Sequence, residues 1–388
     1  MIVAAMNCSA FLSLAACLCL AAAALGAADA SHPAYPLWDG QETVAHYARR
    51  VNLPETQTLD LGNGVTLELV LIPAGKFIMG TPEPKRVDEE AFHKKIVTGQ
   101  AVLAVGGGIL LFLLGGGILR AIRERRRFQY SLRRLIGMTF AAGLCVLGGM
   151  HWWYSKRSLE VVRAEYSAAM SRFKDADDFE KPAHQVMITK PFYMGKYEVT
   201  QAQYQQVMGA NPSKFAGPNL PVGMVSWDDA KEFCRKVNER TAGVSPAGTW
   251  AGGTPAIRLP TEAEWEYACR AGTTTAYYFG DRKTDLARVA WYGAYIGTPH
   301  HPVGQKEPNP WGLYDMLGNV EEWCEECEGS YANQAAKDPR QAPSRQRFTR
   351  GGGLGSNARG CRSARRYWLP QNGLFDNLGF RLMLAVPP

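Results

Sequence analysis

Two uncharged apolar runs constrain the folding of this chain more than any other feature of its sequence. Residues 96–119 and 135–154 contain no Asp, Glu, Lys or Arg. At a rise of 1.5 Å per helical residue, runs of about 20 residues cross a hydrocarbon core of ~30 Å. Two buried core helices are the alternative. We expect a transmembrane hairpin, because the connector between the runs is too strongly charged for a core.

That connector, residues 120–134, holds seven arginines and one acid, Glu124. It supplies 7 − 1 = +6 of the formal net charge of +7, so the rest of the chain is almost neutral. A charge confined to one loop does not make the basic surface that nucleic acid requires, and no nucleic-acid partner is expected. The positive-inside rule places the Arg-rich loop in the cytoplasm and both flanks across the membrane.

The N-terminus points to the same side of the membrane. Residues 1–30 are rich in Ala, Leu and Cys, carry no charge before Asp29, and end in small residues around Ala28–Ala30. This pattern predicts a signal peptide. The absence of Lys or Arg at its start leaves an uncleaved signal anchor open, and Leu14–Cys17 is similar to a lipoprotein cleavage box. We expect a membrane protein whose main domain is periplasmic or extracellular.

A set of ordered motifs follows the apolar runs. The most informative are Gly312–Trp323 (GLYDMLGNVEEW), Arg350–Gly353 and Asn377–Arg381. Others lie at residues 72–80, 196–200, 221–227 and 258–269. Together they resemble the sulfatase-modifying-factor family, whose best-known members are formylglycine-generating enzymes. The resemblance covers residues 60–82 and 182–385, and it implies an α+β, loop-rich, C-type-lectin-like fold with short strands and a few helices.

The resemblance also suggests how the chain is divided. In the family, the segment matching residues 72–80 leads directly into the segment matching residue 182, whereas about a hundred residues intervene here. We therefore expect the hairpin to be inserted into a surface loop of one domain, since such loops tolerate insertions. The expected parts are residues 1–30 (signal peptide or anchor), 31–95 (N-terminal part of the domain), 96–154 (hairpin) and 155–388 (main part).

Several elements of that domain are marked by local signals. Capping boxes begin at Thr200, Ser226 and Thr261, and they predict helices over 201–208, 227–240 and 262–270. Gly209 and Gly272 are the expected stops. A further helix is expected over 42–51 and a strand over 65–72, while residues 31–58 are otherwise interpreted as a polar lead-in. From Thr273 onward we expect loops and short strands.

The family resemblance implies a specific oxidation chemistry. Resembling enzymes use oxygen and a copper ion held by two thiolates, five residues apart, to convert a substrate cysteine to formylglycine. The matching stretch, Gly351–Arg365, contains a single cysteine, Cys361. Aligned from its left end, the two positions are Ser356 and Cys361. Aligned from its right end, they are Gly353 and Ala358. Cys361 is thus a catalytic candidate without a partner, and copper is not expected.

The other cysteines are expected to be structural. By the resemblance, Cys269 makes a bridge to the strand region that contains Cys361. Cys324 and Cys327 form a CxxC pair, for which a short disulfide is favoured over a redox pair or half of a zinc site. Cys234 lies on the apolar face of its predicted helix and is expected to be a buried small hydrophobe.

Calcium is the cofactor that the resemblance implies. The matching positions are Asp315 and Glu322 through side-chain oxygens, with Gly318 and Val320 offering backbone carbonyls. Carboxylate and carbonyl oxygens are the ligands that this hard cation prefers. A turn with solvated acids is the structural alternative.

Three functions are weighed. A binding or accessory module at the membrane is favoured, because the cysteine pair is missing; its partners would be the lipid bilayer and a client such as an exported sulfatase. A formylglycine-generating oxidase is the alternative. A related non-haem iron oxygenase is disfavoured, because the histidine-bearing helical domain of such enzymes is absent from this sequence.

Overall fold

The computed structural model describes residues 35–83, 176–241, 256–295, 297–327, 330–331, 334–340 and 345–386, together with helical residues 160, 164, 167, 170, 171 and 174. The chain divides into two compact units, one made of Met1–Gly80 and Asp178–Pro388 and the other of Thr81–Asp177. Among the described residues, no helix combines the length and apolar character needed to cross a bilayer. The expected signal segment, the hairpin and its Arg-rich loop lie outside the described residues.

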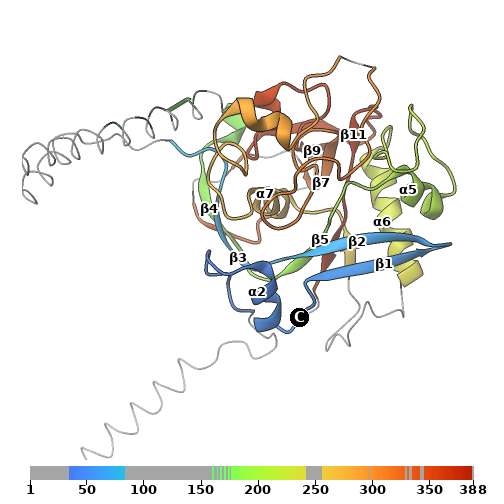
Figure 1. The fold of residues 1–388 in the computed structure, drawn as a ribbon, viewed down its shortest axis with the longest axis horizontal. Coiled ribbons are helices and arrows are strands. Elements are labelled where there is room, and N and C mark those ends of the chain that lie inside the picture. The colour runs from blue at the N-terminus through green and yellow to red at the C-terminus, as the bar shows by residue number, and fades with distance from the viewer. Residues whose placement is uncertain are drawn as a thin grey trace, which may run out of the picture. The chain divides into compact units, whose positions relative to one another are not determined.

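The largest sheet of the first unit has five strands, and each strand runs antiparallel to the strands beside it. Its order is β1 (Thr56–Gly62), β2 (Val65–Ile72), β5 (Phe192–Gly195), β12 (Met383–Ala385) and β6 (Ala256–Arg258). The predicted strand over 65–72 is confirmed as β2, which pairs with β1 in a long hairpin (Figure 1). The interpretation of residues 31–58 as a lead-in was wrong at its end, because β1 begins at Thr56 and its exposed and buried residues alternate.

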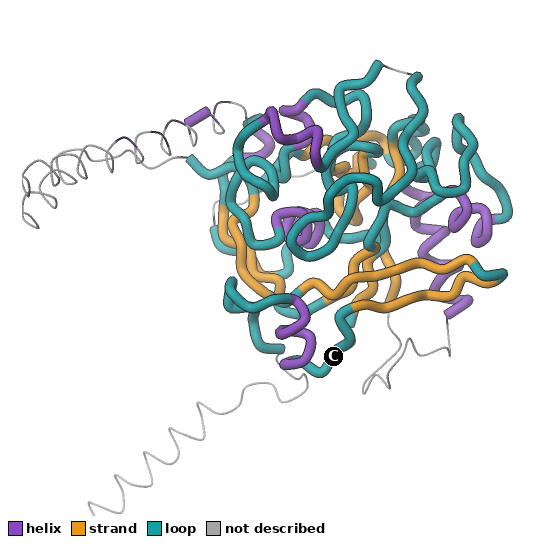
Figure 2. The backbone as a smooth tube through the Cα atoms, viewed as in Figure 1, coloured by secondary structure: helices purple, strands orange, loops and turns teal. Residues whose placement is uncertain are grey.

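Two smaller sheets complete the unit, and long loops separate their short strands (Figure 2). One has the order β10 (Arg366–Pro370), β9 (Gln346–Arg350), β7 (Glu321–Cys327) and β11 (Leu378–Gly379). The other has the order β3 (Gly75–Met79), β4 (His184–Ile188) and β8 (Ala336–Lys337). β11 runs parallel to β7, so the C-terminal motif lies beside the motif at Gly312–Trp323.

The helices follow the sequence closely. They are α2 (Val44–Arg50), α5 (Gln201–Met208), α6 (Trp227–Thr241) and α7 (Glu262–Arg270). Both reciprocal bonds of the capping box form at Thr200 and at Thr261. The bounds differ slightly: α2 is shorter than the expected 42–51, α6 extends one residue further, and α7 is followed by Ala271 in the left-handed conformation, one residue before the expected glycine. This mixture of helices, short strands and loops agrees with the expected α+β class.

Short 3₁₀ turns connect the remaining elements, namely η1 (Asp178–Glu180), η2 (Lys283–Arg288) and η3 (Ala358–Cys361). η1 brings the chain back beside the point where it left the first unit. A Cβ atom on Gly80 would lie 2.4 Å from the carbonyl oxygen of Glu180, so only glycine fits there. The two stretches of the first unit therefore meet where residues 81–177 interrupt them.

Candidate functional site

The loop that the sequence matches to copper chemistry links β9 to η3 and is folded tightly on itself. Gly351 and Gly352 both have positive φ angles, of 89° and 66°. A Cβ on Gly352 would lie 2.7 Å from the carbonyl oxygen of Gly360, so the two ends of the loop touch. The Ser356 hydroxyl accepts a hydrogen bond from the Gly353 amide at 3.1 Å. Local backbone contacts therefore take up much of the space within this loop.

Cys361, at the end of η3, is completely buried. Burial, together with the nearby Glu321 carboxylate, raises the pKa of its thiol to about 12. A thiol with such a pKa stays protonated at neutral pH, whereas a copper ligand or nucleophile must be a thiolate. The other candidate positions, Gly353, Ser356 and Ala358, carry no sulfur. These residues do not fit a copper ion held by two thiolates.

The expected bridge from Cys269 to Cys361 is wrong for this structure, in which both residues are buried thiols. The residue beside the Cys269 sulfur is Ser363. Burial raises the pKa of Cys269 to about 12, and the Ser363 hydroxyl opposes that shift. A serine cannot form a disulfide, and Cys361 lies two residues earlier along the chain, beside Glu321 instead.

The remaining cysteines give one correction and one confirmation. Cys324 is a buried thiol in β7, so the short bridge to Cys327 is not formed; the side chain of Cys327 lies outside the described part. Cys234 is buried on α6 as expected, and burial raises the pKa of its thiol to about 12. Within the described residues, no three His, Cys, Asp or Glu side chains group as metal ligands, so the other half of a zinc site was not found there.

The residues matched to calcium lie in one short segment, Asp315–Glu322, called here the acidic turn, in which a turn leads into the start of β7. Asp315 has a positive φ of 53° and Gly318 one of 85°. A Cβ on Gly318 would lie 2.2 Å from the carbonyl oxygen of Trp291, so glycine is required. One Asp315 carboxylate oxygen, Oδ2, accepts a hydrogen bond from the Gly304 amide at 2.7 Å. The other, Oδ1, is buried and has no hydrogen-bond partner.

Glu322, the second carboxylate of the turn, is already occupied by protein donors. Its Oε2 accepts hydrogen bonds from the Trp265 indole at 2.8 Å and from Arg381 Nε at 2.7 Å. Its Oε1 accepts one from Arg381 Nη2, also at 2.7 Å. All three side chains are fully buried. Glu322 therefore joins β7 to α7 and to the chain beyond β11 through Arg381.

The sequence did not single out a third acid, Glu198, which faces the same turn. Its carboxylate accepts hydrogen bonds from Asn319 Nδ2 at 2.6 Å and from the Val320 amide at 3.0 Å. It is 1 % exposed. The only signal in the sequence was an acid in the family motif at residues 196–200, directly before the apolar Val199. Residues far apart in the chain thus build this site.

The three acids share one positive partner. Burial raises the pKa of Asp315 to about 6; the Gly304 amide and Arg381 oppose that rise, and Glu322 adds to it. Burial, with the charges of Asp315 and Glu322, raises the pKa of Glu198 well above its usual range. If all three were ionised, one guanidinium would face three carboxylates. Such a site can hold a proton or accept a cation.

Asp315 has the chemistry that a calcium ligand at this turn requires. Its orphaned Oδ1 is a buried oxygen ligand without a partner, as a cation site requires. Glu322 offers no open oxygen while Arg381 and Trp265 occupy it. A cation here would therefore rely on Asp315 and on backbone carbonyls such as those of Gly318 and Val320.

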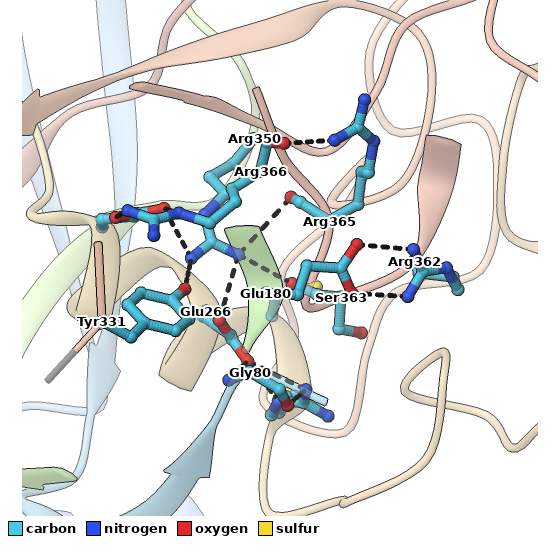
Figure 3. Close-up of polar contacts among 12 residues, drawn as sticks. Gly80, Glu180, Glu266, Tyr331, Arg350, Arg362, Ser363, Arg365 and Arg366 are labelled. Carbon is cyan, nitrogen blue, oxygen red and sulfur yellow. Dashed lines mark hydrogen bonds and ion pairs between the residues drawn. The ribbon is translucent and has the colours of Figure 1, made fainter. Parts of the chain in front are cut away.

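A second buried cluster, called here the arginine lock, is formed around Arg362 and Arg366, which follow Cys361 closely in the chain (Figure 3). Arg362 forms two hydrogen bonds with the Glu180 carboxylate, at 2.6 and 2.5 Å. Arg366 pairs in the same way with Glu262, at 2.6 and 2.5 Å. The lock also contains Arg350, which lies 2.8 Å from Glu262 and 3.0 Å from Glu266.

The lock fastens the point where the chain is interrupted. Glu266 accepts a hydrogen bond from the Gly80 amide at 2.9 Å, and Arg270 donates to the Gly80 carbonyl at 3.0 Å. Because Glu180 pairs with Arg362, the last residue before the interruption and the first turn after it are both held by buried charges. No pattern of residue types pointed to this network, because its members lie far apart in the chain, between Glu180 and Arg366.

Comparisons with known proteins place the chain in a family. The family model described as "Sulfatase-modifying factor enzyme 1-like domain" matches residues 160–386. The chaperone protein LppX of Paenibacillus barcinonensis is 32% identical over 50% of this chain and 79% of its own length. The formylglycine-generating enzyme of Bos taurus is 25% identical over 92% of this chain and 85% of its own. The inactive C-alpha-formylglycine-generating enzyme 2 of the same species is 25% identical over 83% and 90%.

Proposed function

Because the chain belongs to the sulfatase-modifying factor enzyme 1-like family, we propose that it is a membrane-anchored, extracytoplasmic accessory module of that family, which binds a client and lacks the copper-binding cysteine pair. The observation that carries this proposal is the state of Cys361. It is the single sulfur in its loop, it is completely buried, and burial raises its pKa to about 12. An exported sulfatase is the client class that the family suggests.

The relatives give the proposal its context. One carries the name of a chaperone and another that of an inactive formylglycine-generating enzyme, so the family includes proteins named for roles other than the oxidation. Formylglycine generation is the second candidate, favoured by the enzymes among the relatives. It would require copper chemistry with one protonated sulfur, for which the loop offers no second ligand.

A copper and product assay separates the two functions. The purified full-length protein is incubated with Cu(I), oxygen and a peptide containing Cys-x-Pro-x-Arg. We expect no high-affinity copper binding and no formylglycine product by mass spectrometry. The matched variant is Cys361→Ser, which should behave as the wild type does. Stoichiometric copper binding with product formation, lost in the variant, would establish the oxidase instead.

Topology is tested independently. We propose that the runs 96–119 and 135–154 cross the bilayer and that the loop 120–134 is cytoplasmic, with the main domain on the opposite face. A reporter fused at Arg126 is expected to report the cytoplasm, and one fused after residue 386 the opposite side. If a reagent that cannot cross the membrane labels Arg126→Cys in intact cells, the loop lies outside the cytoplasm and the proposed orientation is wrong.

We further propose calcium as a structural ion at the acidic turn, held through Asp315 with the carbonyls of Gly318 and Val320. Glu322 becomes a ligand only if it releases Arg381. The ion would offset the excess of carboxylates and fix the turn. Calcium at a hundred times its Kd should stabilise the fold by about 2.7 kcal/mol. Asp315→Asn should abolish that gain in a calcium titration of thermal unfolding, and an undiminished gain would place the ion elsewhere.

A further inference from the structure

A small pocket lies apart from the acidic turn and the loop of Cys361, and shares no residue with either. Its volume is about 210 Å³. It is formed where the β4–β5 connection, the start of α7, the segment after β8 and the end of β12 come together. Known ligand pockets usually measure ~300–1,000 Å³, so this one has room for a small molecule or for one terminal residue of a peptide.

The floor and part of the wall are apolar, with Ile188, Phe192, Met383 and Val386 among the lining residues. Phe192 and Met383 are both buried and belong to neighbouring strands of the five-stranded sheet. An apolar floor of this kind favours a ligand that carries a short hydrocarbon group.

The acids of the pocket are already engaged. Glu264 accepts two hydrogen bonds of 2.8 Å from the Arg258 guanidinium and a further one from the Thr261 amide. Asp338 accepts hydrogen bonds from the Thr189 amide at 2.9 Å and from the Thr189 hydroxyl at 2.5 Å. The charge of Glu264 is therefore balanced by Arg258, and both carboxylate oxygens of Asp338 are held by Thr189.

Two cations line the same pocket without an ion-pair partner in the part of the chain that the structure describes. They are Lys190, which is half-buried, and Arg340, which is exposed. Arg340 follows Asp338, whose backbone has a positive φ of 43°. Asp338 is held in this conformation by its two hydrogen bonds from Thr189, and it thereby fixes the backbone just before Arg340. Backbone strain of this kind is common at binding sites.

We infer that this pocket binds a small carboxylate with a short apolar group, its charge between Lys190 and Arg340 and its hydrocarbon on Phe192 and Met383. The carboxylate has two possible sources, a free organic acid or the C-terminus of a peptide. The inference goes beyond the proposed function, and it stands whether or not the loop of Cys361 has any activity.

The test uses purified full-length protein and calorimetry with two matched pairs of probes. One pair is 3-methylbutanoate and its amide; the other is acetyl-Gly-Gly-Leu with a free or an amidated C-terminus. We expect each acid to bind at least roughly tenfold more tightly than its amide, because hydrogen bonds to a charged group are the stronger ones. Tighter binding of the peptide acid identifies a chain terminus as the ligand, and equal or tighter binding of 3-methylbutanoate identifies a free acid.

Variants then locate the site. The double variant Lys190→Gln with Arg340→Gln should weaken binding of the acids about tenfold or more. The matched control, Lys337→Gln with Arg345→Gln, removes the same charge from exposed residues that do not line the pocket, and should leave binding unchanged. Binding that is equal for acid and amide, or equally affected by both double variants, would overturn the inference. So would a lack of binding by every probe.

Discussion

The arginine lock and the acidic turn are both buried clusters of acids and arginines, and they differ in their balance of charge. In the arginine lock, Glu180, Glu262 and Glu266 face as many or more guanidinium groups, and each carboxylate has its own. At the acidic turn, the three carboxylates of Glu198, Asp315 and Glu322 share one buried guanidinium, Arg381, and only a weak further contribution from Lys306 reaches Asp315. Both clusters lie in the interior, so the contrast comes from the partners and not from burial.

The pKa values express that difference. Burial alone would raise the pKa of Glu266, but Arg270, Arg350 and the Gly80 amide hold it below its usual range. Burial also raises the pKa of Asp315, and its partners leave it at about 6. Paired guanidinium groups thus favour the ionised form of Glu266, and the lock serves the fold. The excess of carboxylates at the acidic turn raises the pKa values of Asp315 and Glu198, which makes the turn the place to look for function.

Breaking the lock should have the largest effect. Arg362→Met removes both hydrogen bonds to Glu180 and leaves a buried carboxylate without its partner. Removal of one member of a buried pair costs about 3–5 kcal/mol. We expect a loss of that size in the free energy of unfolding, measured by urea denaturation.

An exposed pair provides the control. Arg235 bonds Glu232 and Glu239 on the surface of α6, where its side chain is 54% exposed. Arg235→Met should cost less than about 1 kcal/mol, because surface pairs contribute little. Equal losses in the two variants would mean that the lock contributes no more than a surface ion pair.

The acidic turn should instead reveal itself through pH. A carboxyl with a raised pKa binds its proton more tightly in the folded state, so stability falls as pH rises from the ordinary Asp value of 3.8 to about 6. The loss for Asp315 is on the order of 2–3 kcal/mol. In calcium-free buffer, Asp315→Asn should remove this part of the slope, while Glu198 still contributes a slope in the same direction.

The opposite result is equally informative. If Asp315→Asn has the same pH profile of urea unfolding as the wild type, the carboxyl does not titrate as its surroundings imply. If stability rises more steeply with pH in the wild type than in Asp315→Asn over this range, Asp315 has a lowered pKa, and its charge is then balanced as in the lock.

The smallest effect should come from Lys306. Its ammonium lies 3.7 Å from the centre of the Trp291 ring, and its charge lowers the pKa of Asp315 slightly. Lys306→Met should raise the pKa of Asp315 further and cost less than about 1 kcal/mol. Carbon-13 NMR titration of the Asp315 carboxyl checks the direction, and a fall in its pKa would remove Lys306 from the charge balance of the turn.

Local chemistry let the sequence determine much of this protein. Thr200, Thr261 and their partners three residues later fix where α5 and α7 begin, because both halves of each capping box lie within one turn. Alternation and the Asn63-Gly64 turn mark β2. The family motifs fixed the fold class, and the single cysteine of residues 351–361 set the question about activity.

Only the tertiary structure decided which distant residues meet. Ser363, and not Cys361, lies beside Cys269; Glu198 joins the acidic turn; and Arg381 occupies the carboxylate of Glu322 that the sequence offered to calcium. Each of these contacts joins residues more than 50 positions apart. A pKa or an ion pair depends on distance and burial in space, which a linear pattern of residue types does not contain.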